Sequence, residues 1–144
     1  MIFVFQLPSP GHIVANLEVH LEYDQASGGR LKVSIIKAIG VSTKEQGGFK
    51  SYRVRLSLRQ KKIQSSKTRI RPADSPEFRE LFRFQQVPQA DLSISELVFK
   101  LNGISGKLGK ERMVGSATLN LAAMKASNKQ SFLIPLAAKM NSFS

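Results

Sequence analysis

Apolar and polar residues alternate with a period of two along most of the chain, as they do in strands that bury one face. In the first clear stretch the apolar positions are Leu17, Val19, Leu21 and Tyr23. The most regular stretch sets apolar Tyr52, Val54, Leu56 and Leu58 against polar Ser51, Arg53, Arg55, Ser57 and Arg59. This alternation predicts strands that turn one face to a core and the other to solvent.

Six further strands are expected, at 31–41, 66–71, 80–85, 97–101, 114–121 and 131–136. Turn signals separate them: a glycine pair within 25–30, a loop at 42–50, a break at 72–76 and a glycine-rich loop at 102–110. The connection at 87–95 has no regular pattern, and 122–127 is compatible with a short helix. Eight short strands divided by turns predict an all-β sandwich.

The 144 residues suit one domain with a substantial core. We expect a lead-in at 1–11, the domain at 12–139 and a tail at 140–144. The apolar start of the chain has no basic region before it and is broken at Pro8 and Pro10, so it is not interpreted as a signal peptide. It is either a loosely packed lead-in or a segment whose partner lies elsewhere in a longer protein. No apolar run has the length of a membrane-spanning helix.

Composition restricts the chemistry that the chain can perform. There are 22 Lys and Arg against 10 Asp and Glu, a net charge of +12, with no Cys and 2 His. This excludes disulfides, thiol catalysis and zinc sites built on Cys or three His. His20 between two glutamates, the pair Ser65 and Ser66, and the glycines of the 102–110 loop match no catalytic or phosphate-loop pattern. We therefore predict no enzymatic activity, no cofactor and no metal.

Several motifs follow one another in a recognisable order. They are Asn-Leu-Glu-Val-His-Leu-Glu-Tyr-Asp at 16–24, Leu-Lys-Val-Ser-Ile-Ile-Lys-Ala at 31–38, Ser-Lys-Thr at 66–68, Ser-Pro-Glu-Phe-Arg-Glu at 75–80, Val-Pro at 87–88, Leu-Val-Phe at 97–99 and Val-Gly at 114–115. Together they resemble a C2 domain of the synaptotagmin and tandem-C2 kind over residues 12–139. The resemblance implies an eight-stranded antiparallel Greek-key β-sandwich. It also implies the type I strand order, because the strand ending in Tyr-Asp comes first.

C2 domains that sense calcium hold it with about five Asp from two loops, since Ca²⁺ prefers six to eight oxygen ligands. The corresponding positions in this chain fall near Lys44 or Glu45 and at Lys50, Gly103, Ser105 and Arg112. Only Glu45 offers a carboxylate. The chain therefore resembles the calcium-independent branch of the family, and calcium is not expected as a ligand.

A basic segment carries the first candidate site. Nine of the 22 cations lie in 50–71, and no acid occurs between Glu45 and Asp74. The expected anionic-lipid-binding residues are Arg53, Arg55, Arg59, Lys61, Lys62, Lys67, Arg69 and Arg71. If the two strands of this segment pair, six cations share one surface, and like charges opposite each other are destabilising without an anionic ligand. The alternative is a solvated basic face with no dedicated ligand.

The loop edge is the second candidate site. Its expected contact residues are Lys44, Lys50, Ile104, Lys107, Leu108, Lys110 and Arg112. The cations would make this edge permanently positive, and Ile104 and Leu108 would insert into a membrane interface. The alternative is a degenerate site that only connects strands.

The predicted function is calcium-independent binding of anionic phospholipids, as phosphoinositide or phosphatidylserine, in membrane trafficking and vesicle exocytosis. The resembled family binds such headgroups, and also acidic proteins, through the corresponding basic strands. One alternative is therefore a protein-interaction module for acidic trafficking or fusion proteins, and a second C2 domain is a further candidate partner. Nucleic-acid binding fits less well, because Trp is absent and most Phe have core spacing. We expect a cytoplasmic protein that is peripheral to membranes.

Overall fold

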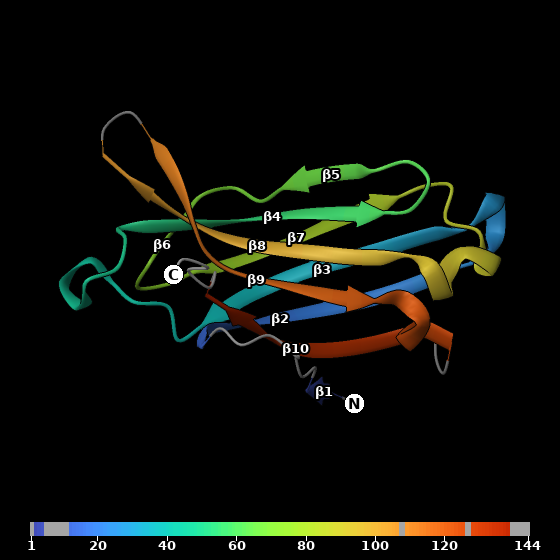
Figure 1. The fold of residues 1–144 in the computed structure, drawn as a ribbon, viewed down its shortest axis with the longest axis horizontal. Helices are drawn as coiled ribbons and strands as arrows, with labels where there is room; N and C mark the ends of the chain where they lie inside the picture. The colour runs from blue at the N-terminus through green and yellow to red at the C-terminus, as the bar shows by residue number, and fades with distance from the viewer. Residues whose placement is uncertain (1, 5–11, 107–108, 126–127, 139–144) are drawn as a thin grey trace, which may run out of the picture.

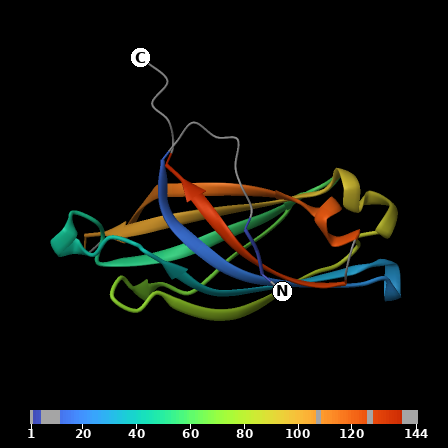
Figure 2. The ribbon, with the colours of Figure 1, turned by 90° about the horizontal axis from the view of Figure 1, so that it is seen from below.

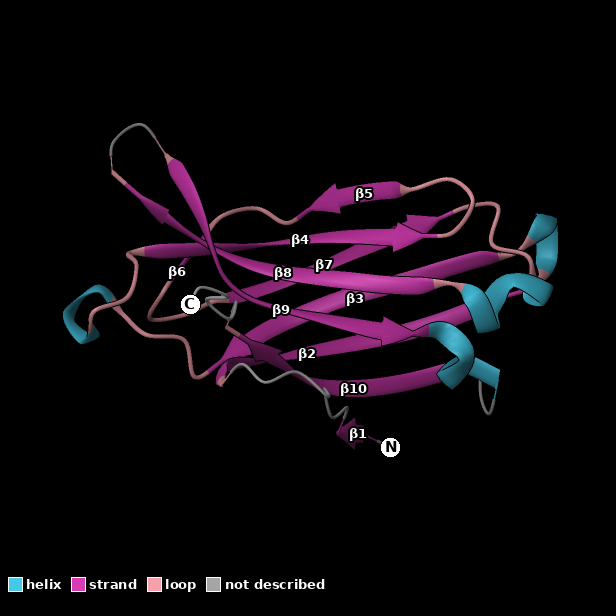
Figure 3. Cartoon of the chain, viewed as in Figure 1, coloured by secondary structure: helices cyan, strands magenta, loops and turns pink. Residues whose placement is uncertain are grey.

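The computed structural model describes residues 2–4, 12–106, 109–125 and 128–138, and it is built almost entirely of strands (Figures 1 and 3). The strands are β1 (Ile2–Val4), β2 (Ile13–Asp24), β3 (Arg30–Ile39), β4 (Ser51–Arg59), β5 (Gln64–Lys67), β6 (Arg71–Pro72), β7 (Glu77–Phe84), β8 (Glu96–Ser105), β9 (Lys110–Asn120) and β10 (Lys129–Ala137). Four short 3-10 helices lie between them: η1 (Ala26–Gly28), η2 (Lys44–Gln46), η3 (Gln89–Ile94) and η4 (Leu121–Lys125).

The strands form two antiparallel four-stranded sheets that lie as layers against each other (Figure 2). The first sheet has the order β5-β4-β8-β9, and the second has the order β10-β2-β3-β7. Within the described residues, β9 and β10 join the sheets through the pair Ser116 and Ala137. The chain crosses between the layers after β3, after β6, after β7 and after β9, which gives the predicted Greek-key sandwich. Its eight predicted strands correspond to all of these except the short β1 and β6.

The core fills the space between the sheets, because each long strand turns one face inward. On β2 and β4 the buried residues alternate as predicted, and Leu17, Val19, Val54 and Leu58 are fully buried. The outward residues of β4 include the arginines of the basic segment. The sandwich therefore presents one face of β4 to the core and its basic face to the outside.

The two ends of the sandwich differ in structure. The loop that contains η2 and the tip of the β8–β9 hairpin lie at one end, at the left in Figure 1, while η1, η3 and η4 lie at the other. At the second end, the buried Tyr23 hydroxyl donates to the carbonyl of Val87 at 2.5 Å, which ties β2 to the segment after β7. Burial and the nearby carboxylates of Asp24 and Asp91 raise the pKa of Tyr23.

Several predicted boundaries differ from the structure. The strand predicted at 66–71 is two strands, β5 and β6, separated by a break at 68–70. The strand predicted from residue 80 begins at Glu77, and Leu81 within it is 42 % exposed because β7 lies at the edge of its sheet. The short helices η3 and η4 occupy the connection at 87–95 and part of the predicted helix at 122–127.

The glycine-rich loop predicted at 102–110 is also different, because the ladder of β8 and β9 continues into it. Ile104 pairs with Glu111, and Ser105 pairs with Lys110. Gly106 and Gly109, with φ of 74° and 66°, begin and end the turn, and these angles are natural for glycine. The third loop is therefore mainly a β-hairpin.

The apolar start of the chain has a partner within the described residues. Ile2–Val4 pairs in parallel with β10, from Ile2 opposite Ser131 to Val4 opposite Leu133. The division into lead-in, domain and tail stays a prediction, since 5–11 and 139–144 lie outside the described residues.

Candidate functional site

A row of three cations crosses the outer face of the first sheet. Arg55 on β4 lies directly opposite Lys67 on β5 and, on its other side, directly opposite Lys100 on β8. Directly opposite residues share a face, with Cβ atoms about 5 Å apart. All three are exposed, and neither lysine has a carboxylate partner among the described residues. We call Lys67, Arg55 and Lys100 the basic row.

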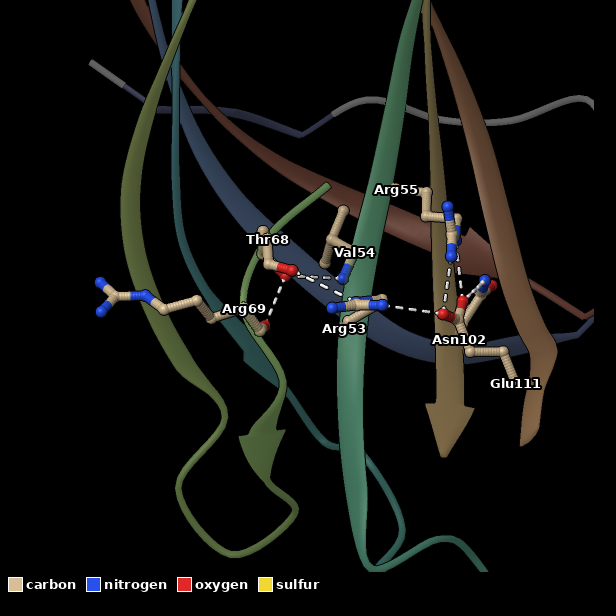
Figure 4. Close-up of polar contacts among 7 residues, drawn as sticks. All are labelled: Arg53, Val54, Arg55, Thr68, Arg69, Asn102 and Glu111. Carbon is tan, nitrogen blue, oxygen red and sulfur yellow. Dashed lines mark hydrogen bonds and ion pairs between the residues drawn. The ribbon is translucent and has the colours of Figure 1, made fainter. Parts of the chain in front are cut away.

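Beside the basic row, one carboxylate gathers the arginines of β4 (Figure 4). Glu111 on β9 accepts four hydrogen bonds, which come from three side chains. Its Oε1 accepts from Arg53 Nη1 at 2.9 Å and Arg55 Nη2 at 2.7 Å, and its Oε2 accepts from Arg55 Nε at 2.8 Å and Asn102 Nδ2 at 2.7 Å. We call Arg53, Arg55, Asn102 and Glu111 the Glu111 cluster.

The Glu111 cluster is shielded from solvent and strongly polarised. The side chains of Arg53 and Glu111 are 16 % and 18 % exposed, while that of Arg55 is 44 % exposed. The hydrogen bonds from Arg55, and then those from Asn102 and Arg53, hold the pKa of Glu111 well below its usual range despite the opposing effect of burial. In turn, the hydrogen bonds to Glu111 raise the pKa of Arg55. Glu111 is therefore an anion, and it neutralises part of the predicted basic face.

Arg69 and Arg71 do not lie on this face, contrary to the expected surface of six cations. The segment between Lys67 and Arg71 contains one more residue than the matching part of β4, since Lys67 lies opposite Arg55 but Arg71 opposite Tyr52. One extra residue reverses the face to which the following side chains point. Figure 4 shows Arg69 directed away from the Glu111 cluster.

Thr68 fixes this change of direction. Its side chain is buried, and its Oγ1 accepts from the Val54 amide at 3.0 Å and donates to the carbonyl of Arg69 at 2.8 Å. The amide of Arg69 then donates to Glu80 Oε2 on β7 at 2.7 Å, and Arg69 Nε lies 3.7 Å from the same oxygen. Arg69 thus faces the second sheet.

The remaining predicted lipid-binding residues lie at the far end of β4. Arg59 is exposed and lies directly opposite Glu96 of β8. Lys61 and Lys62 are exposed in the turn between β4 and β5. These three cations extend the basic face beyond the basic row, although Glu96 offsets part of their charge.

The sequence interpretation missed Lys100, Asn102 and Glu111. Lys100 follows from the alternation on β8, where Phe99 and Leu101 are buried, but its place beside Arg55 depends on a pairing between strands far apart in the chain. Asn102 and Glu111 were placed in the predicted loop. The pairing of Ile104 with Glu111 instead places both residues on the hairpin beside β4.

The loop edge contains a cleft of about 530 Å³ between the first loop and the hairpin. Lys44, Phe49, Lys50 and Ile104 are among its lining residues. Ile104 is 8 % exposed and therefore contributes to the wall of the cleft rather than to an exposed tip. Lys110 and Arg112 are exposed on β9, whereas Lys107 and Leu108 lie outside the described residues.

An aromatic pair organises this edge. The rings of Phe49 and Tyr52 pack edge to face, with centroids 5.9 Å apart and an interplanar angle of 77°. The Tyr52 hydroxyl donates to the carbonyl of Ser42 at 2.5 Å and accepts from the Phe49 amide at 3.2 Å. In the part of the chain that the structure describes, no three His, Asp or Glu residues gather as a metal site would require. The same part contains no helix with the length and hydropathy needed to cross a membrane.

Comparison with known proteins identifies this architecture. The model of the C2 domain family matches residues 29–136. Two solved structures with the same fold are the first-listed C2 domain (domain A) of RIM from Drosophila, with a TM-score of 0.69 and 20 % identity over 85 % of this chain and 98 % of that one, and the corresponding C2 domain of RIM2, with a TM-score of 0.69 and 15 % identity over 86 % and 98 %. The third C2 domain of the KIAA1228 protein also has a TM-score of 0.69, with 16 % identity over 97 % of this chain and 98 % of that one.

C2 domains are generally binding modules without catalytic activity, which commonly bind lipids or proteins in membrane trafficking and typically associate peripherally with membranes. The family match extends over most of the chain, and the two sheets have the C2 strand arrangement. The chain belongs to the C2 domain family.

Proposed function

We propose that this domain binds anionic phospholipid membranes, in the cytoplasm and without calcium, through the outer face of its first sheet. The observation that carries the proposal is the basic row. Lys67, Arg55 and Lys100 are three like charges placed directly opposite one another on adjacent strands. Such an arrangement is destabilising by itself, and an anionic ligand relieves it.

The strength expected from the basic row suits a regulated attachment. A cation near an anionic leaflet contributes about 1 kcal/mol, so three cations contribute at most about 3 kcal/mol. Salt weakens this attraction, because the Debye length is about 8 Å at physiological ionic strength. Stable anchoring then needs a second attachment, such as another membrane-binding domain of the same protein.

Calcium independence is supported by the residues at the loop edge. Lys44, Lys50 and Arg112 are exposed cations at or next to positions where the calcium pattern of the family requires carboxylates. Gly103, another such position, is covered by the ring of Phe49, so the space of an acidic side chain is already filled. Divalent cations prefer oxygen ligands with negative charge, and this edge offers mainly positive groups.

A vesicle-binding assay tests the proposal. Phosphatidylcholine vesicles with and without phosphatidylserine or phosphatidylinositol 4,5-bisphosphate are compared in EGTA and in calcium. We expect binding to the anionic vesicles in EGTA, with no increase on adding calcium. Binding that requires calcium, or an absence of binding to both anionic vesicles, overturns the proposal.

Two double variants test the location of the site. Lys67→Gln with Lys100→Gln removes the lysines of the basic row and should weaken binding by up to about 30-fold, the factor for two charges at about 1 kcal/mol each. Lys32→Gln with Lys37→Gln removes the same charge from β3 in the second sheet and should have a much smaller effect. Equal losses in the two double variants indicate attraction by net charge without a defined site.

A further inference from the structure

The Glu111 carboxylate occupies the side of Arg55 that is best suited to bind phosphate. The Nε and Nη2 groups of a guanidinium form a fork that matches two oxygens of a carboxylate or phosphate. In Arg55 both groups donate to Glu111, at 2.8 and 2.7 Å. A headgroup at the basic row therefore meets a fork that already holds an anion.

The donors around Glu111 are held in place independently of it. Arg53 also donates through Nε to the carbonyl of Thr68 at 3.2 Å, and its side chain is only 16 % exposed. Asn102 is 8 % exposed, and its Oδ1 is buried without a hydrogen-bond partner in the described structure. If Glu111 rotates away, the cluster retains three side chains whose N–H groups point to one place, the arrangement of a phosphate site.

We infer that Glu111 is a built-in competitor that makes the basic face selective for phosphomonoester headgroups over phosphodiester headgroups. The inference rests on the proposed function and specifies the ligand of the same site. A phosphodiester carries one negative charge, as Glu111 does, and gains nothing in charge by replacing it. A phosphomonoester carries about 1.5 to 2 negative charges near pH 7 and has three strong acceptor oxygens. It therefore gains both charge and hydrogen bonds when it replaces Glu111.

The same geometry assigns different tasks to the two parts of the face. Lys67 and Lys100 lie on either side of Arg55 and attract any anionic surface, since an ammonium group acts largely as a point charge. The Glu111 cluster then distinguishes among the headgroups that this attraction brings near. General attraction comes from the lysines, and selectivity comes from the carboxylate.

The test compares wild type with Glu111→Gln on two kinds of vesicle. One contains phosphatidylglycerol, a phosphodiester, and the other contains phosphatidylinositol 4,5-bisphosphate at equal total surface charge. Wild type should prefer the second. Glu111→Gln should bind phosphatidylglycerol about fivefold more tightly, the factor expected for one elementary charge near an anionic surface, and should gain less on the second vesicle. The preference then falls.

Glu22→Gln is the matched control, because it removes one carboxylate charge from β2 in the second sheet. It should leave the preference of the wild type unchanged. If wild type binds both vesicles but Glu111→Gln keeps the wild-type preference, or Glu22→Gln lowers it equally, the inference fails while the proposed function stands. If wild type binds neither vesicle, both fail.

A second measurement on the wild-type domain avoids any effect of substitution on folding. The domain is titrated with inositol 1,4,5-trisphosphate while the NMR signals of the Glu111 carboxyl carbon and the Arg55 Nε–H group are followed. Both signals should shift with one saturation curve as the phosphate displaces the carboxylate. A Glu111 signal that stays constant while the lysine signals of the basic row shift overturns the inference.

Discussion

The ring of Phe49 lies against the α-carbon of Gly103 and so joins the first loop to the β8–β9 hairpin. A Cβ atom at Gly103 would overlap the ring atoms Cγ, Cδ1 and Cε1 of Phe49. Phe49 is itself held by its edge-to-face contact with Tyr52 and by the hydrogen bond from its amide to the Tyr52 hydroxyl. Gly103 is therefore required by packing at a position to which the calcium pattern of the family assigns an acid.

The substitution Gly103→Ala should destabilise the domain by about 1–3 kcal/mol, because a methyl group forces the Phe49 ring out of its site. The backbone at Gly103 does not have a positive φ, so the cost arises from the ring. Urea unfolding of the wild type and the variant measures the difference in free energy.

A double-mutant cycle isolates the contact between the two residues. Phe49→Leu removes the planar ring, and Gly103→Ala should then cost less in the Phe49→Leu background than in the wild type. Additive effects of the two substitutions would show that the ring does not limit the space at Gly103.

Thr68→Val should destabilise the domain by about 1–3 kcal/mol, although valine has nearly the same shape. The buried Thr68 hydroxyl accepts from the Val54 amide and donates to the carbonyl of Arg69, and valine leaves both groups without this partner. Thermal and urea unfolding measure the loss.

Ser66→Ala is the control for Thr68→Val, because it removes a hydroxyl from the same edge segment. Ser66 lies opposite Leu56 and is only half-buried, so its effect should be within about 0.5 kcal/mol. A Thr68→Val variant as stable as Ser66→Ala would mean that water replaces the hydroxyl at no cost, and that Thr68 does not fix the break between β5 and β6.

The alternation of apolar residues was sufficient to predict the sandwich and the buried faces of its regular strands. On β4 the prediction is confirmed residue by residue, from Tyr52 to Leu58, because a strand without irregularities alternates strictly between core and solvent. The motifs at 16–24 and 75–80 added the family and the strand order, which periodicity alone does not contain.

The candidate site was less predictable because it depends on register. One extra residue between Lys67 and Arg71 moves Arg71 off the face of Arg55, and no feature of the basic sequence marks it. Lys100 and Glu111 come close to Arg55 only through pairings with β4 and within the hairpin. These pairings join segments more than 40 residues apart, which local patterns do not relate.

Glu111 should make the stability of the domain depend on pH in the acid range. Its pKa in the folded state lies below that of an unfolded glutamate, about 4.3, chiefly because of the hydrogen bonds from Arg55. A depressed carboxyl pKa contributes stability above the unfolded pKa and loses it as pH falls toward the folded value. We expect wild type to be more stable than Glu111→Gln at pH 7 by about 1.5–3 kcal/mol, and the difference to shrink below about pH 4.

Urea unfolding of both proteins between about pH 7 and pH 3 measures this dependence. Other carboxyl groups, such as Asp24, whose pKa is lowered chiefly by the hydrogen bond from the Ala26 amide, contribute equally to both curves and cancel in the difference. A difference that stays constant over the whole range would show that the charge of Glu111 does not stabilise the fold.

Arg69→Gln with Arg71→Gln should reduce vesicle binding much less than Lys67→Gln with Lys100→Gln, although both double variants remove two positive charges. Arg69 is directed toward Glu80 of β7, and both arginines line a separate hollow together with Arg79. Anionic vesicles at two or three salt concentrations distinguish the pairs, and we expect a loss of less than about fivefold for the arginine pair, against up to about 30-fold for the lysine pair. Salt dependence should also weaken more in the lysine variant, since it loses the cations that meet the membrane. A larger loss in the arginine variant would move the membrane contact to the surface beside β7 and leave the basic row as a solvated face.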